Sequence, residues 1–143
     1  MNTKVQTVHT PNLSTRLYQS LFETRVSAGF PSPATDYEED KLDLNKHLIK
    51  HPAATFFVRA IGDSMVRAGI HCGDLLVVDR SLEPRDKSVV IAVVNGELTV
   101  KRIRIRKKKI TLEPENNNYS AQEINENMEF EVWGVVTSVI HKL

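Results

Sequence analysis

The sequence predicts a compact, mainly β domain of short antiparallel strands, preceded by a flexible N-terminal arm that carries a short helix. Two observations predict the domain. From residue 55 onward, runs rich in Val, Ile and aromatic residues alternate with turn residues. Asn95-Gly96 stands between two such runs, and both positions of an Asn-Gly turn favour positive φ, which indicates a hairpin. Short strands joined by tight turns are typical of antiparallel β domains.

The first 34 residues form the expected arm. After Thr10-Pro11, which suits a helix start, leucines recur every fourth residue and give one apolar stripe: Leu13, Leu17 and Leu21. Pro31 and Pro33 then favour an extended path. A segment this short is not expected to fold alone. We therefore divide the chain into an arm, residues 1–34, and a β-rich domain, residues 35–143.

An acidic stretch opens the domain, and we interpret it as a solvated helix or loop face: Asp36, Glu38, Glu39, Asp40 and Asp43. A short helix containing Leu44 and Leu48 is expected to end before His51-Pro52. The strands that follow are predicted at residues 55–61, 74–79, 88–94, 97–105, 109–113 and 131–141. Lys107-Lys108 is expected to turn the hairpin between the fourth and fifth of these.

Composition narrows the class of protein. Apolar residues make up 41% and charged residues 26% of the 143 positions, as in ordinary soluble proteins. A net charge of +1 argues against DNA binding through bulk charge alone. The single cysteine excludes an internal disulfide and suits a reducing compartment. The longest apolar run, residues 89–94, is far below the roughly 20 residues of a membrane span. We expect a cytoplasmic protein.

A candidate nucleophile follows the first predicted strand of the domain, in Gly62-Asp63-Ser64-Met65. A serine exposed at a strand end can attack a carbonyl if a base removes its proton. Backbone N–H groups at such a turn, here those of Asp63 and Ser64, can stabilise the resulting oxyanion. The same residues are also typical of an ordinary turn. Both interpretations stay open on this motif alone.

The candidate base is Lys101. Alternate residues of a strand face opposite sides, so one side carries Thr99, Lys101, Ile103 and Ile105 and the other Arg102, Arg104 and Arg106. Lys101 thus lies on the apolar side, whereas the three arginines are expected to point to water. A lysine there either extends its amine to solvent at the strand edge or has a functional role. Burial can lower a lysine pKa by about 3–5 units, and a neutral amine beside Ser64 would accept its proton.

Other groups give weaker signals. The five histidines lack metal-ligand spacing; His47 and His51 are four apart, but Pro52 ends any helix there. We therefore expect no metal and no cofactor. His71 and Cys72 are adjacent, so their side chains should diverge rather than form a catalytic pair. The basic residues from 102 to 109 form either a solvated strand face and turn or a contact with DNA backbone or an acidic protein surface.

Taken in order, motifs from Ala28 to the C-terminus resemble the LexA/UmuD family of self-cleaving SOS-response proteins, and most closely its UmuD type. The matching segments are AGFPSPA at 28–34, DLN at 43–45, HPAAT at 51–55, GDSM at 62–65, GDLLVVD at 73–79, GELTVK at 96–101 and WGVV at 133–136. The resemblance implies a LexA/signal-peptidase-like β fold. It also implies that Ser64 is the nucleophile and Lys101 the base of a serine endopeptidase.

The resemblance further implies that the substrate is the arm itself, cut between Ala28 and Gly29. UmuD-type proteins usually carry Cys before the scissile glycine, whereas Ala28 follows the repressor form. The family implies that a RecA–single-stranded-DNA filament promotes the cut. It also implies a homodimer that, without its arm, serves as accessory subunit of a UmuC-type error-prone translesion DNA polymerase. No sequence-specific DNA binding is expected.

Three alternatives compete with this interpretation. A LexA-like repressor needs a folded DNA-reading domain before the cut, for which 28 residues with one short helix are too few. A type I signal peptidase has a similar Ser–Lys site, but it needs a membrane anchor that this sequence lacks. A non-catalytic dimeric binding module would keep Ser64 and Lys101 as structural residues, and measuring cleavage separates it from a peptidase.

Overall fold

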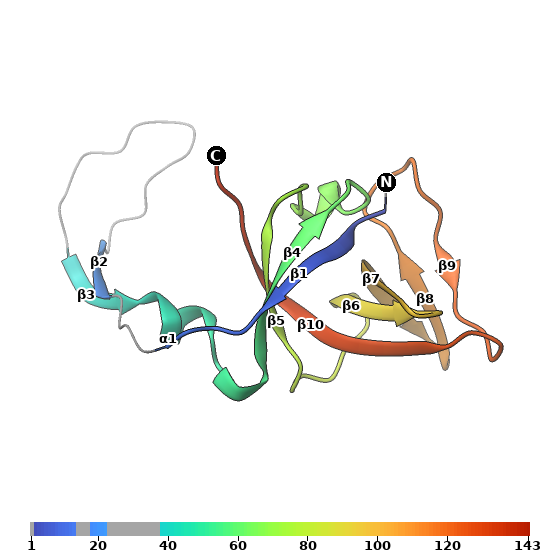
Figure 1. Cartoon of the computed structure of the whole chain (residues 1–143), viewed down its shortest axis with the longest axis horizontal. Helices are drawn as coiled ribbons and strands as arrows, with labels where there is room; N and C mark the ends of the chain where they lie inside the picture. Colours follow the sequence, from blue (N-terminus) through green and yellow to red (C-terminus); the bar gives the residue numbers. More distant parts are fainter. Residues whose placement is uncertain (1, 14–17, 23–37) are drawn as a thin grey trace. The chain divides into compact units, whose positions relative to one another are not determined.

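The computed structural model of the chain describes residues 2–13, 18–22 and 38–143, and the side chains of all of these except 18–22 and 38–41. The chain forms two compact units (Figure 1). The barrel unit consists of Met1–Pro11 and His51–Leu143, and the hairpin unit consists of Asn12–Lys50.

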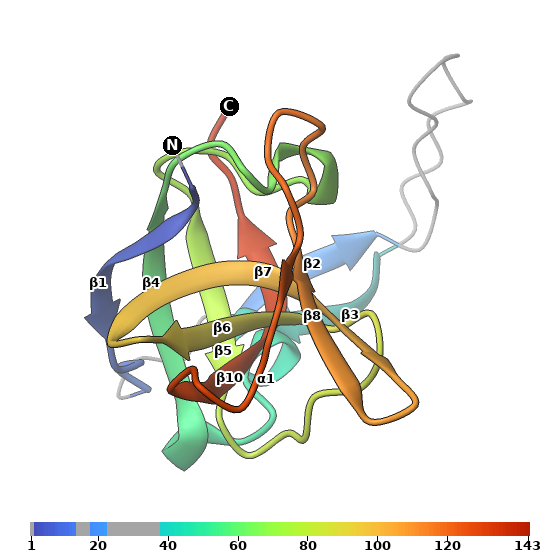
Figure 2. The ribbon, with the colours of Figure 1, turned by 90° about the vertical axis from the view of Figure 1, so that its right-hand side faces the viewer.

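The barrel unit is built on one antiparallel sheet. In spatial order its described strands are β1 (Lys4–His9), β4 (Thr55–Ile61), β5 (Leu75–Asp79), β10 (Phe130–Ile140), β6 (Val89–Val94), β7 (Glu97–Arg106), β8 (Lys109–Glu113) and β9 (Gln122–Glu123). Lys4 of β1 also pairs with Thr99 of β7, so the strands from β1 to β7 close into a ring (Figure 2). Strands β8 and β9 extend the sheet beyond β7. Short 3-10 helices cover Pro52–Ala54 and Val66–Ala68.

The mainly β fold is confirmed. All six strands predicted from residue 55 onward are present, each with ends within one residue of the expected position. Asn95 and Gly96 have φ of 48° and 82°, and they turn the β6–β7 hairpin as expected. Lys107 and Lys108, with φ of 49° and 65°, turn the β7–β8 hairpin. Local turn chemistry therefore sets the register of both hairpins.

Two apolar clusters fill the barrel unit. The first joins β4, β5 and β7 around Met65 and Ile70, and the second lies between β6, β7, β8 and β10 around Ile103 and Leu112. Gly134 lies at a bulge of β10, where an added Cβ would lie 2.5 Å from Cγ1 of Val78. Only glycine allows this approach of β10 to β5.

The N-terminal residues differ from the expectation of an arm outside the core. Strand β1 pairs antiparallel with β4, and Thr3, immediately before it, is fully buried. The side chains of β1 are half-buried or exposed, so the sequence gives little apolar signal. The strand is held mainly by backbone hydrogen bonds to the edge of β4. Strand propensity and hydrophobic periodicity in the sequence do not reveal such a pairing.

The hairpin unit contains β2 (Tyr18–Phe22), β3 (Glu38–Asp43) and α1 (Leu44–Leu48), with β2 and β3 antiparallel. The expected helix is wrong at Tyr18–Phe22, since isolated helices this short are marginal and pairing with β3 satisfies the backbone instead. The acidic stretch likewise becomes a strand from Glu38. The short helix is confirmed as α1, whose first turn Asp43 caps by accepting from the Asn45 N–H. In the described ranges, no helix has the length and apolarity to cross a membrane.

Candidate active site

Ser64 lies in the turn that follows β4. Gly62, with φ of 95°, lets the chain leave the strand sharply, and Met65 packs into the core just after the serine. This places the Ser64 hydroxyl inside the protein, with no exposed surface. A buried hydroxyl needs hydrogen-bond partners, and it has two: an amine and a backbone N–H.

The amine is that of Lys101 on β7. Its Nζ lies 3.1 Å from Oγ of Ser64, and the residue is only 7% exposed. Nζ also lies 3.2 Å from the hydroxyl of Thr99 and 3.3 Å from the carbonyl oxygen of Val100. The expected position of Lys101 on the apolar side of its strand is therefore confirmed, and its amine points into the protein rather than to solvent.

Burial lowers the pKa of Lys101 from 10.5 to about 8, because the ammonium loses hydration that the protein does not replace. At pH 7 about one amine in ten is then neutral, against about one in 2,500 for an ordinary lysine. The neutral amine has two N–H groups and one lone pair. In the structure Nζ donates to three acceptors, the hydroxyls of Ser64 and Thr99 and the carbonyl of Val100. A neutral amine can donate to only two of them, so with Thr99 and Val100 as acceptors its lone pair is available for the hydroxyl proton of Ser64.

A loop after β8 holds the serine turn in place. The N–H of Glu115 donates to the carbonyl oxygen of Ser64 at 2.8 Å, and the Glu115 carbonyl accepts from the N–H of Arg67 at 2.9 Å. The Asn116 amide donates to the backbone carbonyl of Asp63, and the Tyr119 hydroxyl donates to its carboxylate. Sequence reasoning missed this loop because its contacts span about 50 residues and follow no motif.

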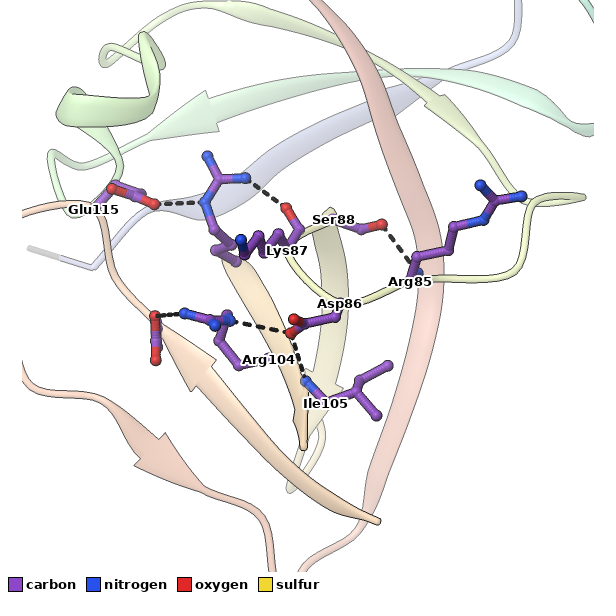
Figure 3. Close-up of polar contacts among 9 residues, drawn as sticks. Arg85, Asp86, Lys87, Ser88, Arg104, Ile105 and Glu115 are labelled. Carbon is purple, nitrogen blue, oxygen red and sulfur yellow. Dashed lines mark hydrogen bonds and ion pairs between the residues drawn. The ribbon is translucent and has the colours of Figure 1, made fainter. Parts of the chain in front are cut away.

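The same loop is tied to the strand that carries the lysine. The carboxylate of Glu115 accepts a short hydrogen bond from the guanidinium of Arg102, the next residue after Lys101, and Figure 3 shows this pair. Glu115 therefore contacts the serine turn through its backbone and β7 through its side chain. This arrangement fixes the separation of the two candidate catalytic groups.

The arginine face of β7 is not the freely solvated surface that was expected. The guanidinium of Arg104 pairs with Asp86 and Glu113, and the Asp86 carboxylate also accepts from the backbone N–H of Ile105 (Figure 3). These bonds lower the pKa of the Asp86 carboxyl group, first through the Ile105 N–H and then through Arg104. Arg102 and Arg104 thus brace the sheet, whereas residues 106–109 are exposed at the hairpin tip.

The N-terminal segment occupies the space in front of the pair. The N–H of Thr3 donates to Oγ of Ser64 at 2.7 Å, and the Thr3 carbonyl accepts from the N–H of Val100 at 3.0 Å. The hydroxyl of Thr3 is buried and has no hydrogen-bond partner among the residues that the structure describes. Such an unsatisfied group costs about 1–3 kcal/mol, so Thr3 fits this position imperfectly.

A pocket of about 320 Å³ opens beside Lys101, between Lys4 and Gln122. The expected cleavage site, Ala28 and Gly29, lies outside the described residues. The expected oxyanion-hole residues Asp63 and Ser64 lie together in the serine turn, and the role of their N–H groups stays a prediction.

The ring of antiparallel strands and the buried contact between Ser64 and Lys101 define the class as a β protein whose site is compatible with a serine peptidase. The sequence agrees with this class, since residues 20–137 match the Peptidase S24-like family. The chain belongs to this family, the LexA/UmuD family of self-cleaving SOS-response proteins, and stands with its UmuD-like members.

Three similar relatives place it there. Protein SamA of Salmonella typhimurium is 52% identical over 122 residues, covering 85% of this chain and 84% of SamA. Protein ImpA of Escherichia coli is 51% identical over 123 residues, covering 85% of this chain and 83% of ImpA. Protein MucA of Escherichia coli is 46% identical over 114 residues, covering 79% of this chain and 77% of MucA.

Proposed function

We propose that this protein cuts its own peptide bond between Ala28 and Gly29, with Ser64 as nucleophile and Lys101 as general base. The observation that carries the proposal is the 3.1 Å contact between the Ser64 hydroxyl and a buried amine whose pKa is lowered to about 8. A nucleophile and a base within hydrogen-bond reach are what acyl transfer requires.

The reaction runs in two steps. The neutral Lys101 amine takes the hydroxyl proton of Ser64 as Oγ attacks the carbonyl carbon of Ala28. The resulting ammonium then protonates the Gly29 nitrogen, and the C–N bond breaks to leave an ester between Ala28 and Ser64. A water molecule hydrolyses this ester with Lys101 again as base. We assign the backbone N–H groups of Asp63 and Ser64 to the oxyanion that forms in each step.

The substrate must displace the strand that fills the site. Thr3 donates its N–H to the hydroxyl that would attack, so residues 2–4 and the segment around Ala28-Gly29 are alternative occupants of one position. In this proposal both belong to one arm, residues 1–34, that precedes a peptidase domain, residues 35–143, although β1 of the arm pairs with β4 of the barrel unit. Because the arm is covalently attached, its effective concentration at the site is high. The rate of cleavage is then set by how often the segment around Ala28-Gly29 replaces residues 2–4 beside Ser64.

In the cell, we propose that the cut is part of the SOS response. Family membership and the UmuD-like relatives support a role in SOS mutagenesis. In this proposal a RecA–single-stranded-DNA filament promotes the cytoplasmic cleavage by favouring arm exchange. The product is a homodimer that acts as accessory subunit of a UmuC-type translesion polymerase. The stimulating filament acts on the arm, since Ser64 and Lys101 are already in contact.

Intact-mass spectrometry tests the peptidase directly. Purified protein kept near pH 10 without any cofactor should yield two fragments, residues 1–28 and 29–143. Ser64→Ala and Lys101→Ala should each abolish the cut. Cys72→Ala is the matched control, since Cys72 is an exposed nucleophile outside the site, and it should cut at the normal rate. A different cut site, or cleavage that persists in Ser64→Ala, refutes the assignment and favours a non-catalytic binding module.

A further inference from the structure

A second cluster of polar side chains lies in the barrel unit, built from His71, Asp74 and His141. One potential ligand atom from each residue can be chosen so that all three atoms lie within 4.8 Å of one another. His71 and Asp74 belong to one turn before β5, closed by a hydrogen bond from the Asp74 N–H to the His71 carbonyl. His141 follows β10, whose Ile140 pairs with Leu75 of β5, so the sheet register brings the second imidazole to the same turn.

The carboxylate at the centre of this cluster is already oriented. The Asp74 side chain is 3% exposed, and its Oδ2 accepts from the backbone N–H of His71 at 2.7 Å. Its Oδ1 lies 2.5 Å from Nδ1 of His141, and Oδ2 lies 3.7 Å from Nδ1 of His71. Both imidazoles are about half exposed, with ring centroids 4.9 Å apart. A fixed, buried carboxylate is thus flanked by two half-exposed imidazoles.

We propose that His71, Asp74 and His141 bind a divalent transition-metal ion of the Zn²⁺ type. Two imidazole nitrogens and one carboxylate oxygen are the donors that Zn²⁺ accepts in sites with an open fourth position. At metal–ligand distances of about 2.0–2.2 Å, neighbouring ligand atoms stand about 3.3 Å apart. Small rotations of the two imidazoles reach this spacing from the present geometry, and the buried carboxylate need not move.

Binding through Nδ1 of His141 also has a tautomer requirement. Nδ1 lies 2.5 Å from Oδ1 of Asp74, and a metal ion bound at Nδ1 would need the ring proton on Nε2. The ion would clamp the end of β10 to the turn before β5.

A pocket of about 480 Å³ adjoins two of the three proposed ligands, Asp74 and His141, and Arg59 and Lys142 line it as well. These two cations reduce the affinity for a bare metal ion. They also favour an anion, such as hydroxide or a carboxylate, as the fourth ligand. The site does not depend on the peptidase proposal, since none of its ligands contacts Ser64 or Lys101 in the contacts described above.

Calorimetric titration with Zn²⁺ alone tests the site, using the full chain with Ser64→Ala so that it stays intact. We expect one ion per chain, and at least about tenfold weaker binding in both His71→Ala and His141→Ala. These residues are half exposed, so their variants should fold, which circular dichroism checks. A matched control exists in His51→Ala, because His51 makes a similar contact with a buried carboxylate, 2.6 Å from Asp79, without a second imidazole in the cluster.

Cys72→Ser is the second control, because Cys72 lies in the same turn but outside the ligand set. Both controls should bind as the parent does. Absence of Zn²⁺ binding overturns the proposal, and so does binding that survives in His71→Ala and His141→Ala. Binding lost in Cys72→Ser or His51→Ala would assign the ion to other residues and overturn it as well.

Discussion

Burial of Lys101 lowers the free energy of unfolding of the protein at neutral pH. Its amine is removed from water and pairs with no carboxylate among the described residues, so the folded state holds a proton less tightly than the unfolded chain. The unfolded chain binds more protons between pH about 8 and pH 10.5. The contribution of this residue to the free energy of unfolding therefore rises with pH across that window and is lost as pH falls through it.

This linkage predicts a difference between the protein and a Lys101→Met variant, which keeps an apolar side chain of similar length. In a Ser64→Ala background, the variant should be the more stable of the two at pH 7. Its advantage should shrink between pH about 8 and 10.5, because the lysine penalty disappears there. Urea unfolding of both proteins at several pH values measures this. An advantage that is independent of pH would mean that Lys101 is not desolvated.

The sequence singled out both candidate catalytic residues through local signals that left other interpretations open, and their catalytic roles came from the family resemblance. Ser64 follows a strand in a turn, and the alternation of β7 puts Lys101 on the apolar side. Their partners Thr3 and Glu115 carry no such signal. Like His141 beside Asp74, they reach their positions through contacts between distant parts of the chain. Such contacts are fixed by topology, which one sequence does not reveal.

At the scale of elements, β1 has a double role. It closes the ring between β4 and β7, and it places Thr3 on the nucleophile. The Thr3 hydroxyl is buried without a partner among the described residues, so this strand is held less firmly than a fully satisfied one. An occupant of this kind can be exchanged for the segment around Ala28, as the proposed cleavage requires.

Two substitutions at Thr3 should therefore change the rate of self-cleavage in opposite directions. Thr3→Val removes the unsatisfied hydroxyl at nearly constant volume, which should hold β1 more firmly and slow cleavage by up to about tenfold. Thr3→Pro removes the N–H that donates to Ser64 and should accelerate cleavage. First-order rates from the loss of intact mass measure both effects. Equal rates in the two variants would show that β1 does not compete with the substrate.

Six of the strands from residue 55 onward were predictable, whereas β9 and the earlier strands β1, β2 and β3 were not. The predicted strands are apolar, half-buried and bounded by turn residues, so propensity and burial agree. The missed strands include β1, whose side chains are mostly exposed, and the two-residue β9. They depend on backbone pairing with a neighbour, and for β2 an apparent helical period pointed to the wrong structure.

For the whole molecule, the proposed cut separates a barrel strand from its barrel. β1 lies within residues 1–28, so the fragment 29–143 keeps β4 and β7 without the strand that bridges them. Two strand edges with unpaired backbone groups are then open to another chain, as edge strands generally are. Cleavage thus changes the binding surface of the protein as well as its length.

Hydrogen exchange should detect this change in the purified 29–143 fragment. The N–H of Val100 donates to the carbonyl of Thr3 in the intact chain and should exchange faster once Thr3 is removed. The N–H groups that form the hydrogen bonds between β5 and β10 should stay protected, because the pairing of these two strands does not involve β1. Unchanged exchange at Val100 would mean that Thr3 does not protect this N–H in the intact protein in solution, which would contradict the position of β1.

The proposed self-cleavage depends most on a neutral amine beside the serine hydroxyl, and the pH dependence of the cleavage rate tests this most directly. The first-order rate should rise about tenfold from pH 7 to pH 9, with a midpoint near 8, and then level off as Lys101 becomes fully neutral. A rate that keeps rising about tenfold per pH unit up to pH 10 would indicate an ordinary, solvated lysine and would contradict the account.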